Sequence, residues 1–342
     1  MLFTEPLVDE LKKLDHLVYV TSRHYREVES LFKKSPFDVF LVGKHGGGLL
    51  YEKLLASSER VHKLAELVNR WEPELSIHFG SPEGARVAFG LKIPQICIHD
   101  SPHSESVNRL TLPLVDHLVT PSVIPYNAWK NYSFMRKNIT RYDAIDPAVW
   151  LKRRKVEKLN LGVFGADPNR RTITVRYEES YASYLLDKDK EWGTTVIDAL
   201  SSKFPEYNLI VLGRYEDQIL RLTEKYGDKV IIPKDIVDGA SLLKSSDLFV
   251  GMGGTMTEEA ALLGVPTISA FQGANLYYIS YLVKEGLVVK SKGIDHLLRA
   301  AETLLTDEIA RKQISERAKR TLQKMEDPVK TVLSVVIQFK KS

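Results

Sequence analysis

The stretch that decides the fold is Asp247-Leu-Phe-Val-Gly-Met-Gly-Gly-Thr-Met-Thr-Glu-Glu-Ala-Ala-Leu-Leu-Gly-Val-Pro-Thr-Ile-Ser269. Its apolar start, which ends at Val250, indicates a β-strand. Three glycines follow, and they allow a sharp turn and a close approach of the backbone to a ligand. The next residues indicate a helix over Thr257–Leu263, which Gly264-Val-Pro266 ends. The stretch therefore predicts a strand, a glycine turn, a helix and a second strand.

The start of this helix is a candidate diphosphate site. Its N–H groups lack partners within the helix and lie at the positive end of the helix dipole, which favours an anion. Glu259, inside the helix, could accept hydrogen bonds from both hydroxyls of a ribose. The alternative is an ordinary strand–helix turn with a solvated pair of glutamates. The glycines followed by Glu-Glu-Ala favour a nucleotide site, with Gly253, Gly254 and Thr255 at the phosphates.

Composition narrows the class of protein. The length of 342 residues suits two α/β domains, and 44% hydrophobic with 27% charged residues is typical of a soluble globular protein. A net charge of +4 fits an anionic small ligand or loose attraction to an anionic membrane surface. Aromatic residues do not interleave with the basic runs, so we expect no nucleic-acid partner.

The distribution of cysteine, histidine and apolar residues excludes further classes. The single cysteine, Cys97, allows no intrachain disulfide and favours a reducing cytosol. No His/Asp/Glu set has the spacing of a metal site, so we expect no metal and no cofactor. No apolar stretch has membrane-spanning length, and we expect no signal peptide. The sequence therefore predicts a cytoplasmic protein without a transmembrane segment.

Short β-type runs alternate with helical patterns along most of the chain, which predicts parallel sheets with helices on both faces. The expected strands are His16–Thr21, Asp38–Val42, Leu75–Phe79, Gln95–His99, His117–Thr120, Ile139–Tyr142, Thr172–Arg176, Asn208–Leu212, Lys229–Ile232, Asp247–Val250, Pro266–Ala270 and Leu287–Val289.

The expected strands and helices divide into two Rossmann-type domains, residues 1–150 and 159–325. A basic linker within Pro147–Lys158 joins them. We expect residues 326–342 to form a helix that packs back on the N-terminal domain.

The beginning of the chain departs from the usual order of such a domain. Pro6–Lys13 predicts a first helix with Thr4 as its cap, and only Met1-Leu-Phe3 precedes it. The strand that normally precedes this helix is central in its sheet. Either the true start lies upstream, or the sheet lacks a strand. We favour the upstream start, because a central gap would leave backbone groups without partners.

Ligands of open parallel sheets bind beyond the carboxyl ends of the strands, which selects the loops there. Lys44 and His45, in the loop Gly43–Gly48, could contact a sugar or an acceptor, or the loop could simply be mobile. Arg176 and Arg214 each end a strand and could bind phosphate through the guanidinium fork. The alternative for both arginines is an ion pair with Glu178, Glu179 or Glu216.

The loop Asp100–Arg109 carries the candidate catalytic groups of the first half. Asp100 or His103 could act as a general base, and Glu105 could orient either of them. Asn108 and Arg109 are expected to brace the loop, and Glu105 can instead pair with Arg109 four residues on.

A resemblance follows from four segments, Val42–Gly48, Asn108–Pro113, Val175–Ser180 and Gly251–Ser269. Over nearly its full length the chain resembles an uncharacterised, largely archaeal family of GT-B-like proteins. That family is related to UDP-N-acetylglucosamine 2-epimerases and to the peptidoglycan N-acetylglucosaminyl transferase. The resemblance implies two Rossmann-type domains facing a central cleft, with the first strand of the N-terminal domain missing.

The resemblance also implies roles for the two domains. Residues 1–150 would hold the acceptor, and residues 159–325 would bind a nucleotide sugar, with Glu259 on the ribose and the uracil near Ile232–Asp238. Arg176, Arg214, Lys44, His45 and Asn108 would complete the substrate contacts. The acidic residues of the epimerases are mostly replaced, as in Phe79-Gly-Ser81 and His99–His103, and only Glu105 keeps a matching carboxylate.

The resemblance implies a metal-independent glycosyltransferase that moves the sugar of a UDP-N-acetylhexosamine to an unknown acceptor. The basic linker leaves room for a lipid-linked acceptor at the inner membrane face, where contact would be peripheral. Two alternatives stay open. One is a UDP-sugar 2-epimerase-type isomerase, and the other is a non-catalytic nucleotide-sugar-binding subunit.

Overall fold

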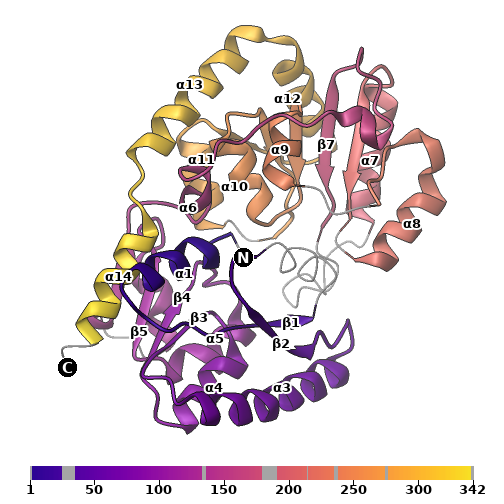
Figure 1. The fold of residues 1–342 in the computed structure, drawn as a ribbon. Coiled ribbons are helices and arrows are strands. Elements are labelled where there is room, and N and C mark those ends of the chain that lie inside the picture. The colour runs from indigo at the N-terminus through magenta and orange to yellow at the C-terminus, as the bar shows by residue number, and fades with distance from the viewer. Residues whose placement is uncertain are drawn as a thin grey trace. The chain divides into compact units, whose positions relative to one another are not determined.

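The computed structural model describes residues 2–24, 35–132, 136–178, 191–213, 215–234, 238–273 and 276–339. The chain divides into two compact units (Figure 1). The first unit consists of Met1–Trp150 together with Glu326–Ser342, and the second is Leu151–Met325. Each unit is a parallel α/β structure, which confirms the predicted fold class.

The strands of the first unit lie in two separate parallel sheets. One sheet has the order β3-β4-β5-β6, and the other consists of β1 and β2. Their bounds are β1 Val20–His24, β2 Val39–Lys44, β3 Ser76–Phe79, β4 Gln95–Ile98, β5 His117–Pro121 and β6 Ile139–Tyr142. The helices are α1 Thr4–Lys13, α3 Leu50–Trp71, α4 Pro82–Gly90, α5 Glu105–Thr111, α6 Ala148–Leu151 and α14 Pro328–Phe339.

The core of the first unit forms around β4, all four residues of which are buried. A strand with neighbours on both edges and cover on both faces must be apolar throughout, and Gln95-Ile-Cys-Ile98 meets this need at three of its four positions. Cys97 packs in a cluster with Leu112, Leu118 and Trp129, which are all less than 2% exposed. The lone cysteine is therefore a core residue of this unit.

The second unit contains one parallel sheet with the order β11-β10-β9-β7-β8. Its strands are β7 Thr172–Arg176, β8 Asn208–Leu212, β9 Leu248–Gly251, β10 Thr267–Ser269 and β11 Val288–Lys290. Its helices are α7 Trp192–Lys203, α8 Glu216–Tyr226, α9 Gly239–Lys244, α10 Thr255–Leu262, α11 Tyr277–Lys284, α12 Ile294–Thr306 and α13 Glu308–Lys324. The order reverses between β9 and β7, as in nucleotide-binding sheets.

Three local expectations need correction. The run Lys229–Ile232 makes only an isolated bridge, between Ile231 and Ile210, because Gly227–Lys229 turns as a 3-10 helix. The strand expected at His16–Thr21 begins at Val20 instead. Thr4 lies inside the first turn of α1, since the buried Phe3 occupies the N-cap. Among the helices of the described ranges, none has the length and apolarity needed to cross a membrane.

A substitution at Gly251, the last residue of β9, would test how tightly the decisive stretch is packed. A Cβ at this position would lie 2.1 Å from Thr257 Oγ1 and 2.8 Å from Phe249 Cε1, both in fully buried residues. We expect Gly251→Ala to lower the free energy of unfolding by about 1–3 kcal/mol, because this core cannot yield without strain. The control is Gly239→Ala, the same substitution at a position where the nearest atom to the new Cβ is Met256 Cε, 3.6 Å away. Equal urea midpoints for the two variants would contradict the prediction.

Candidate functional site

The glycine turn lies where the strand order of the second unit reverses. Gly251, at the end of β9, is the register partner of Arg176, at the end of β7, and Met252 N donates to Arg176 O at 3.2 Å. Open parallel sheets bind ligands beyond the carboxyl ends of their strands at this reversal. The decisive stretch of the sequence is therefore also at the topologically favoured position for a ligand.

The backbone of the turn leaves the start of α10 accessible. Gly254 is the N-cap of α10 with φ of 81°, a conformation that glycine adopts without strain. Among the residues that the structure describes, no side chain caps the helix, and both Gly254 and Thr255 are exposed. The first N–H groups of α10 are thus accessible to an anion, and the diphosphate position there stays a prediction.

Two buried polar side chains of α10 face the turn and its surroundings. The hydroxyl of Thr257 is fully buried against Gly251 and has no hydrogen-bond partner within the described residues. Glu259 is 5% exposed, and its Oε2 lies 4.0 Å from the position that a Cβ on Gly239 would take. Its carboxyl group therefore lies beside the start of α9, next to the segment where the uracil was expected. Residues 235–237 of that segment are outside the described ranges.

Of the two candidate phosphate-binding arginines, the structure describes only Arg176. Arg176 Nη1 donates to the carbonyl of Gly213 at 2.9 Å, which links the carboxyl ends of the adjacent strands β7 and β8. This bond gives Arg176 a bracing role in addition to its predicted contact with phosphate. Arg214 and Glu179 lie outside the described residues.

In the first unit the loop after β4 is held by a buried asparagine. Asn108 is fully buried, and its Nδ2 donates to the carbonyls of Ser101 and Pro102, both at 3.1 Å. Its Oδ1 lies 2.7 Å from His99 Nε2. Because the asparagine oxygen can only accept, His99 carries its proton on Nε2. Asn108 therefore braces the loop, as the sequence predicted.

A carboxyl group missed by the sequence reasoning lies near Asp100. Asp146 follows β6, and Tyr142 Oη donates to its Oδ1. Burial first, and then the negative charge of Asp100, raise the pKa of Asp146 to about 8, although the hydrogen bond from Tyr142 opposes the rise. The strand-end rule, applied to the loop after Ile139–Tyr142, would have found this residue.

The structure also shows the surroundings of His103 and Glu105, the other two candidates in the loop after β4. Burial lowers the pKa of His103, while the charge of Asp100 opposes the shift. His103 is therefore neutral at pH 7 and able to accept a proton. Glu105 is exposed, and its Oε1 accepts from Arg109 Nε at 2.9 Å and from Nη2 at 2.6 Å. These bonds confirm the local pairing that the spacing allowed.

The loop after β2 presents a polar group beside an apolar surface. Lys44 is exposed, and His45 Nδ1 accepts from Gly47 N at 3.1 Å. The large apolar side chains that follow, at the start of α3, are 47–72% exposed: Leu49, Leu50, Tyr51, Leu54 and Leu55. We call these five residues the α3 patch.

No group of three or more His, Cys, Asp or Glu side chains among the described residues could hold a metal ion.

Comparison with solved structures shows a shared fold. The UDP-GlcNAc 2-epimerase from Neisseria meningitidis, bound to UDP-GlcNAc, aligns with a TM-score of 0.72 and 14% identity, over 98% of this chain and 96% of that one. The Methanocaldococcus jannaschii UDP-GlcNAc 2-epimerase, in complex with UDP-GlcNAc and UDP, gives 0.71 and 16%, over 100% and 96%. The spinosyn rhamnosyltransferase SpnG gives 0.62 and 13%, over 98% and 96%. The chain thus has the GT-B-type fold of these epimerases and glycosyltransferases.

Sequence comparison identifies the family. The uncharacterized protein MJ0665 of Methanocaldococcus jannaschii is 31% identical over 267 residues, which are 76% of this chain and 75% of that protein. The family described as "Protein of unknown function (DUF354)" matches residues 2–341. With this match over nearly its whole length, the chain belongs to the DUF354 family.

Proposed function

We propose that the second unit binds a UDP-sugar at the glycine turn and that the protein transfers the sugar to an acceptor. The observation that carries the proposal is the uncapped, exposed start of α10 at the reversal of strand order, with the buried carboxyl of Glu259 in the same helix. The fold likeness supports it, since two of the similar structures hold UDP-GlcNAc.

Each part of the turn has a role in holding the nucleotide. The N–H groups at Thr255 and Met256 would donate to the diphosphate, whose charge the helix dipole favours. Glu259 would accept hydrogen bonds from the two ribose hydroxyls, and the uracil would lie near the start of α9. A UDP-linked N-acetylhexosamine is the donor that we propose.

In the transfer step, the acceptor hydroxyl oxygen attacks the anomeric carbon while the bond from that carbon to the diphosphate oxygen breaks. A base takes the hydroxyl proton, and the start of α10 stabilises the negative charge that develops on UDP. We propose Asp100 as the base, because it is the charged carboxylate beside Asp146, which its raised pKa keeps protonated at pH 7. His103, neutral at pH 7, is the alternative base.

The fold of the epimerases supports a second candidate, a UDP-sugar isomerase. Incubation of the protein with UDP-GlcNAc alone distinguishes the two. Mass-neutral conversion of the nucleotide sugar without an acceptor would identify an isomerase. UDP release that depends on an added acceptor would identify a transferase, and tight binding without turnover a nucleotide-sugar-binding subunit.

The donor site is tested by a thermal-shift panel of UDP, UDP-GlcNAc, ADP and NAD. We expect a uridine nucleotide at about 100 times its Kd to stabilise the protein by about 2.7 kcal/mol, which corresponds to a rise of several degrees in Tm. Glu259→Gln should abolish most of the shift, because the amide loses the negative charge and replaces one of the two acceptor oxygens with an NH2 donor. Glu258→Gln, at the equally buried neighbouring position, should retain it. An undiminished shift in Glu259→Gln would rule out the ribose role.

The raised pKa of Asp146 predicts a pH dependence of stability. Between the ordinary aspartate pKa and about 8, the folded protein binds one proton more than the unfolded chain. Its stability should therefore fall as the pH rises through this window, by up to about 1.4 kcal/mol per pH unit. Asp146→Asn, an isostere of the protonated acid, should lose this part of the slope and be more stable than the wild type above pH 8. The measurement is the free energy of unfolding in urea for both proteins at several pH values from 5 to 9. The assignment would be refuted if the two proteins showed the same dependence on pH.

The α3 patch supports an acceptor with a lipid part, because contiguous exposed apolar side chains mark interaction sites. We expect the protein to sediment with phosphatidylglycerol vesicles, and the double variant Leu50→Glu/Leu54→Glu to bind them at least tenfold more weakly. The control is Leu220→Glu/Ile309→Glu, which replaces apolar residues that are exposed in the second unit. Equal loss in both double variants would show that the patch has no special role.

A further inference from the structure

The basic run of the linker, Lys152-Arg-Arg-Lys155, belongs to the second unit, and its residues have different surroundings. Lys155 is exposed and pairs with Glu157, two residues on, at 2.7 Å. Arg154 Nη2 instead donates to Asp238 Oδ1 at 2.8 Å, 84 residues further along the chain. One arginine of the run therefore reaches a distant element of the same unit.

The element that Arg154 reaches is α9, and the linker contacts both ends of this helix. Asp238 directly precedes α9, so the bond from Arg154 holds the start of the helix. At its other end, Lys244 Nζ donates to the carbonyl of Val156 at 2.6 Å. The position of α9 thus depends on the linker as well as on the core of the unit.

The carboxylate of Asp238 is held from two sides. Its Oδ1 accepts from Arg154, and its Oδ2 accepts from Ser241 Oγ, in the first turn of α9, at 2.5 Å. Burial would raise the pKa of Asp238, but the hydrogen bonds from Ser241 and Arg154 outweigh it and hold the pKa below its usual range. Asp238 is therefore charged at pH 7 and accepts both bonds.

The start of α9 also lies against the helix that carries Glu259. A Cβ on Gly239, the residue after Asp238, would lie 3.6 Å from Met256 Cε and 4.0 Å from Glu259 Oε2. These are ordinary contact distances, so the backbone at Gly239 forms a wall beside the Glu259 carboxyl group. Binding groups act well only when they are held within about 0.5 Å of the productive geometry. A loosened start of α9 would not keep this wall in place.

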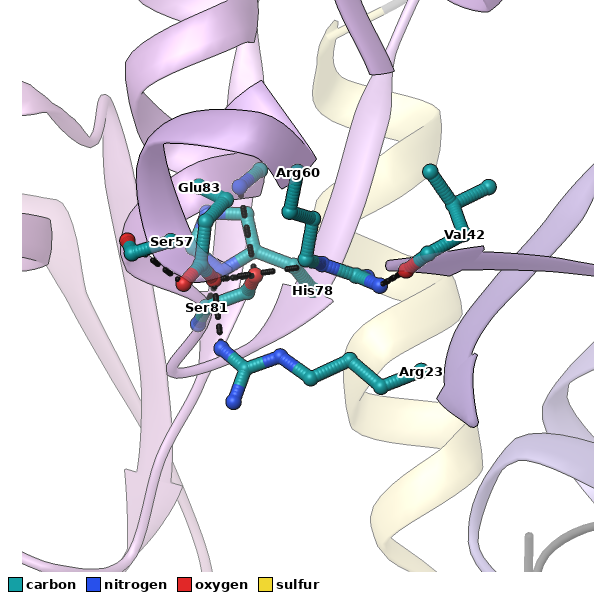
Figure 2. Close-up of polar contacts among 8 residues, drawn as sticks. Arg23, Val42, Ser57, Arg60, His78, Ser81 and Glu83 are labelled. Atoms are coloured by element: carbon teal, nitrogen blue, oxygen red, sulfur yellow. Dashed lines mark hydrogen bonds and ion pairs between the residues drawn. The ribbon is translucent and has the colours of Figure 1, made fainter. Parts of the chain in front are cut away.

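The Arg154–Asp238 pair differs from a buried ion pair of the first unit. There the carboxylate of Glu83 is buried and accepts from Arg23 at 2.6 Å and from Ser57 at 2.8 Å (Figure 2). Breaking such a buried pair is strongly destabilising. The side chains of Arg154 and Asp238 are 36% and 43% exposed, and ion pairs this exposed contribute little to stability. The Arg154–Asp238 pair can therefore be broken in a protein that stays folded.

We propose that Arg154 is a positioning residue of the donor site. By holding Asp238, it keeps the start of α9 against Glu259 and so fixes the wall along which the uridine of the donor lies. Arg154 acts through Asp238 and does not itself bind the nucleotide. This inference rests on the proposed UDP-sugar site.

A purely electrostatic role of the pair would give a different pattern of effects. UDP is an anion, so charge alone predicts that loss of Arg154 weakens UDP binding and that loss of Asp238 strengthens it. In a positioning pair, removal of either member weakens binding, and removal of the second adds nothing further. The sign and the additivity of two substitutions therefore separate the two roles.

The test measures the Kd of UDP by isothermal titration calorimetry on the full chain. We expect Arg154→Met and Asp238→Ala each to raise the Kd about tenfold, and the double variant to match Asp238→Ala within about twofold. Arg154→Lys can still pair with Asp238 and should stay within about threefold of the wild type. The control is Lys155→Met, which removes the same charge one residue away and should bind UDP like the wild type.

Urea unfolding of the same variants separates positioning from a general loss of structure. Arg154→Met and Lys155→Met should have equal urea midpoints, because both residues form exposed ion pairs. A lower midpoint for Arg154→Met that accompanies its weaker binding would overturn the inference.

Three results of the calorimetry would also overturn it. They are UDP binding by Asp238→Ala that is as tight as in the wild type or tighter, additive effects in the double variant, and equal UDP binding by Arg154→Met and Lys155→Met. If the wild type itself does not bind UDP, the proposed donor site is wrong, and the inference fails together with it.

Discussion

The need of every interior parallel strand for a backbone partner on both edges governs this structure. The second unit meets it, since β10, β9 and β7 each lie between two neighbours. In the described part of the first unit, β4 and β5 each lie between two neighbours, and β1 and β2 pair in a separate sheet. The same rule accounts for the buried, apolar character of the central strands in both units.

The reversal of strand order in the second unit has a direct consequence for binding. When neighbouring strands send their connections in opposite directions, the carboxyl ends at the reversal are not covered by a crossover. Gly251 and Arg176 meet there, and α10 starts there without a side-chain cap. Gly251 leaves no space for a side chain, because the buried hydroxyl of Thr257 packs against it, whereas the space around Gly254 is open.

Burial gives the polar groups of the first unit their properties. Asn108 fixes the loop after β4 with three hydrogen bonds, and this loop carries both Asp100 and His103. The same burial raises the pKa of Asp146 and lowers that of His103. One group is thereby kept protonated and the other neutral at pH 7, a separation of roles that proton transfer requires.

The sequence by itself determined the features that depend on near neighbours. The alternation of strands and helices, the glycine turn after Val250 and the Glu105–Arg109 pair follow from periodicity and short spacing. Only the tertiary structure decided which distant side chains meet. Arg23 and Glu83 are 60 residues apart, and the charge of Asp100 raises the pKa of Asp146 from another strand end. Such contacts depend on strand order and packing, which local patterns do not encode.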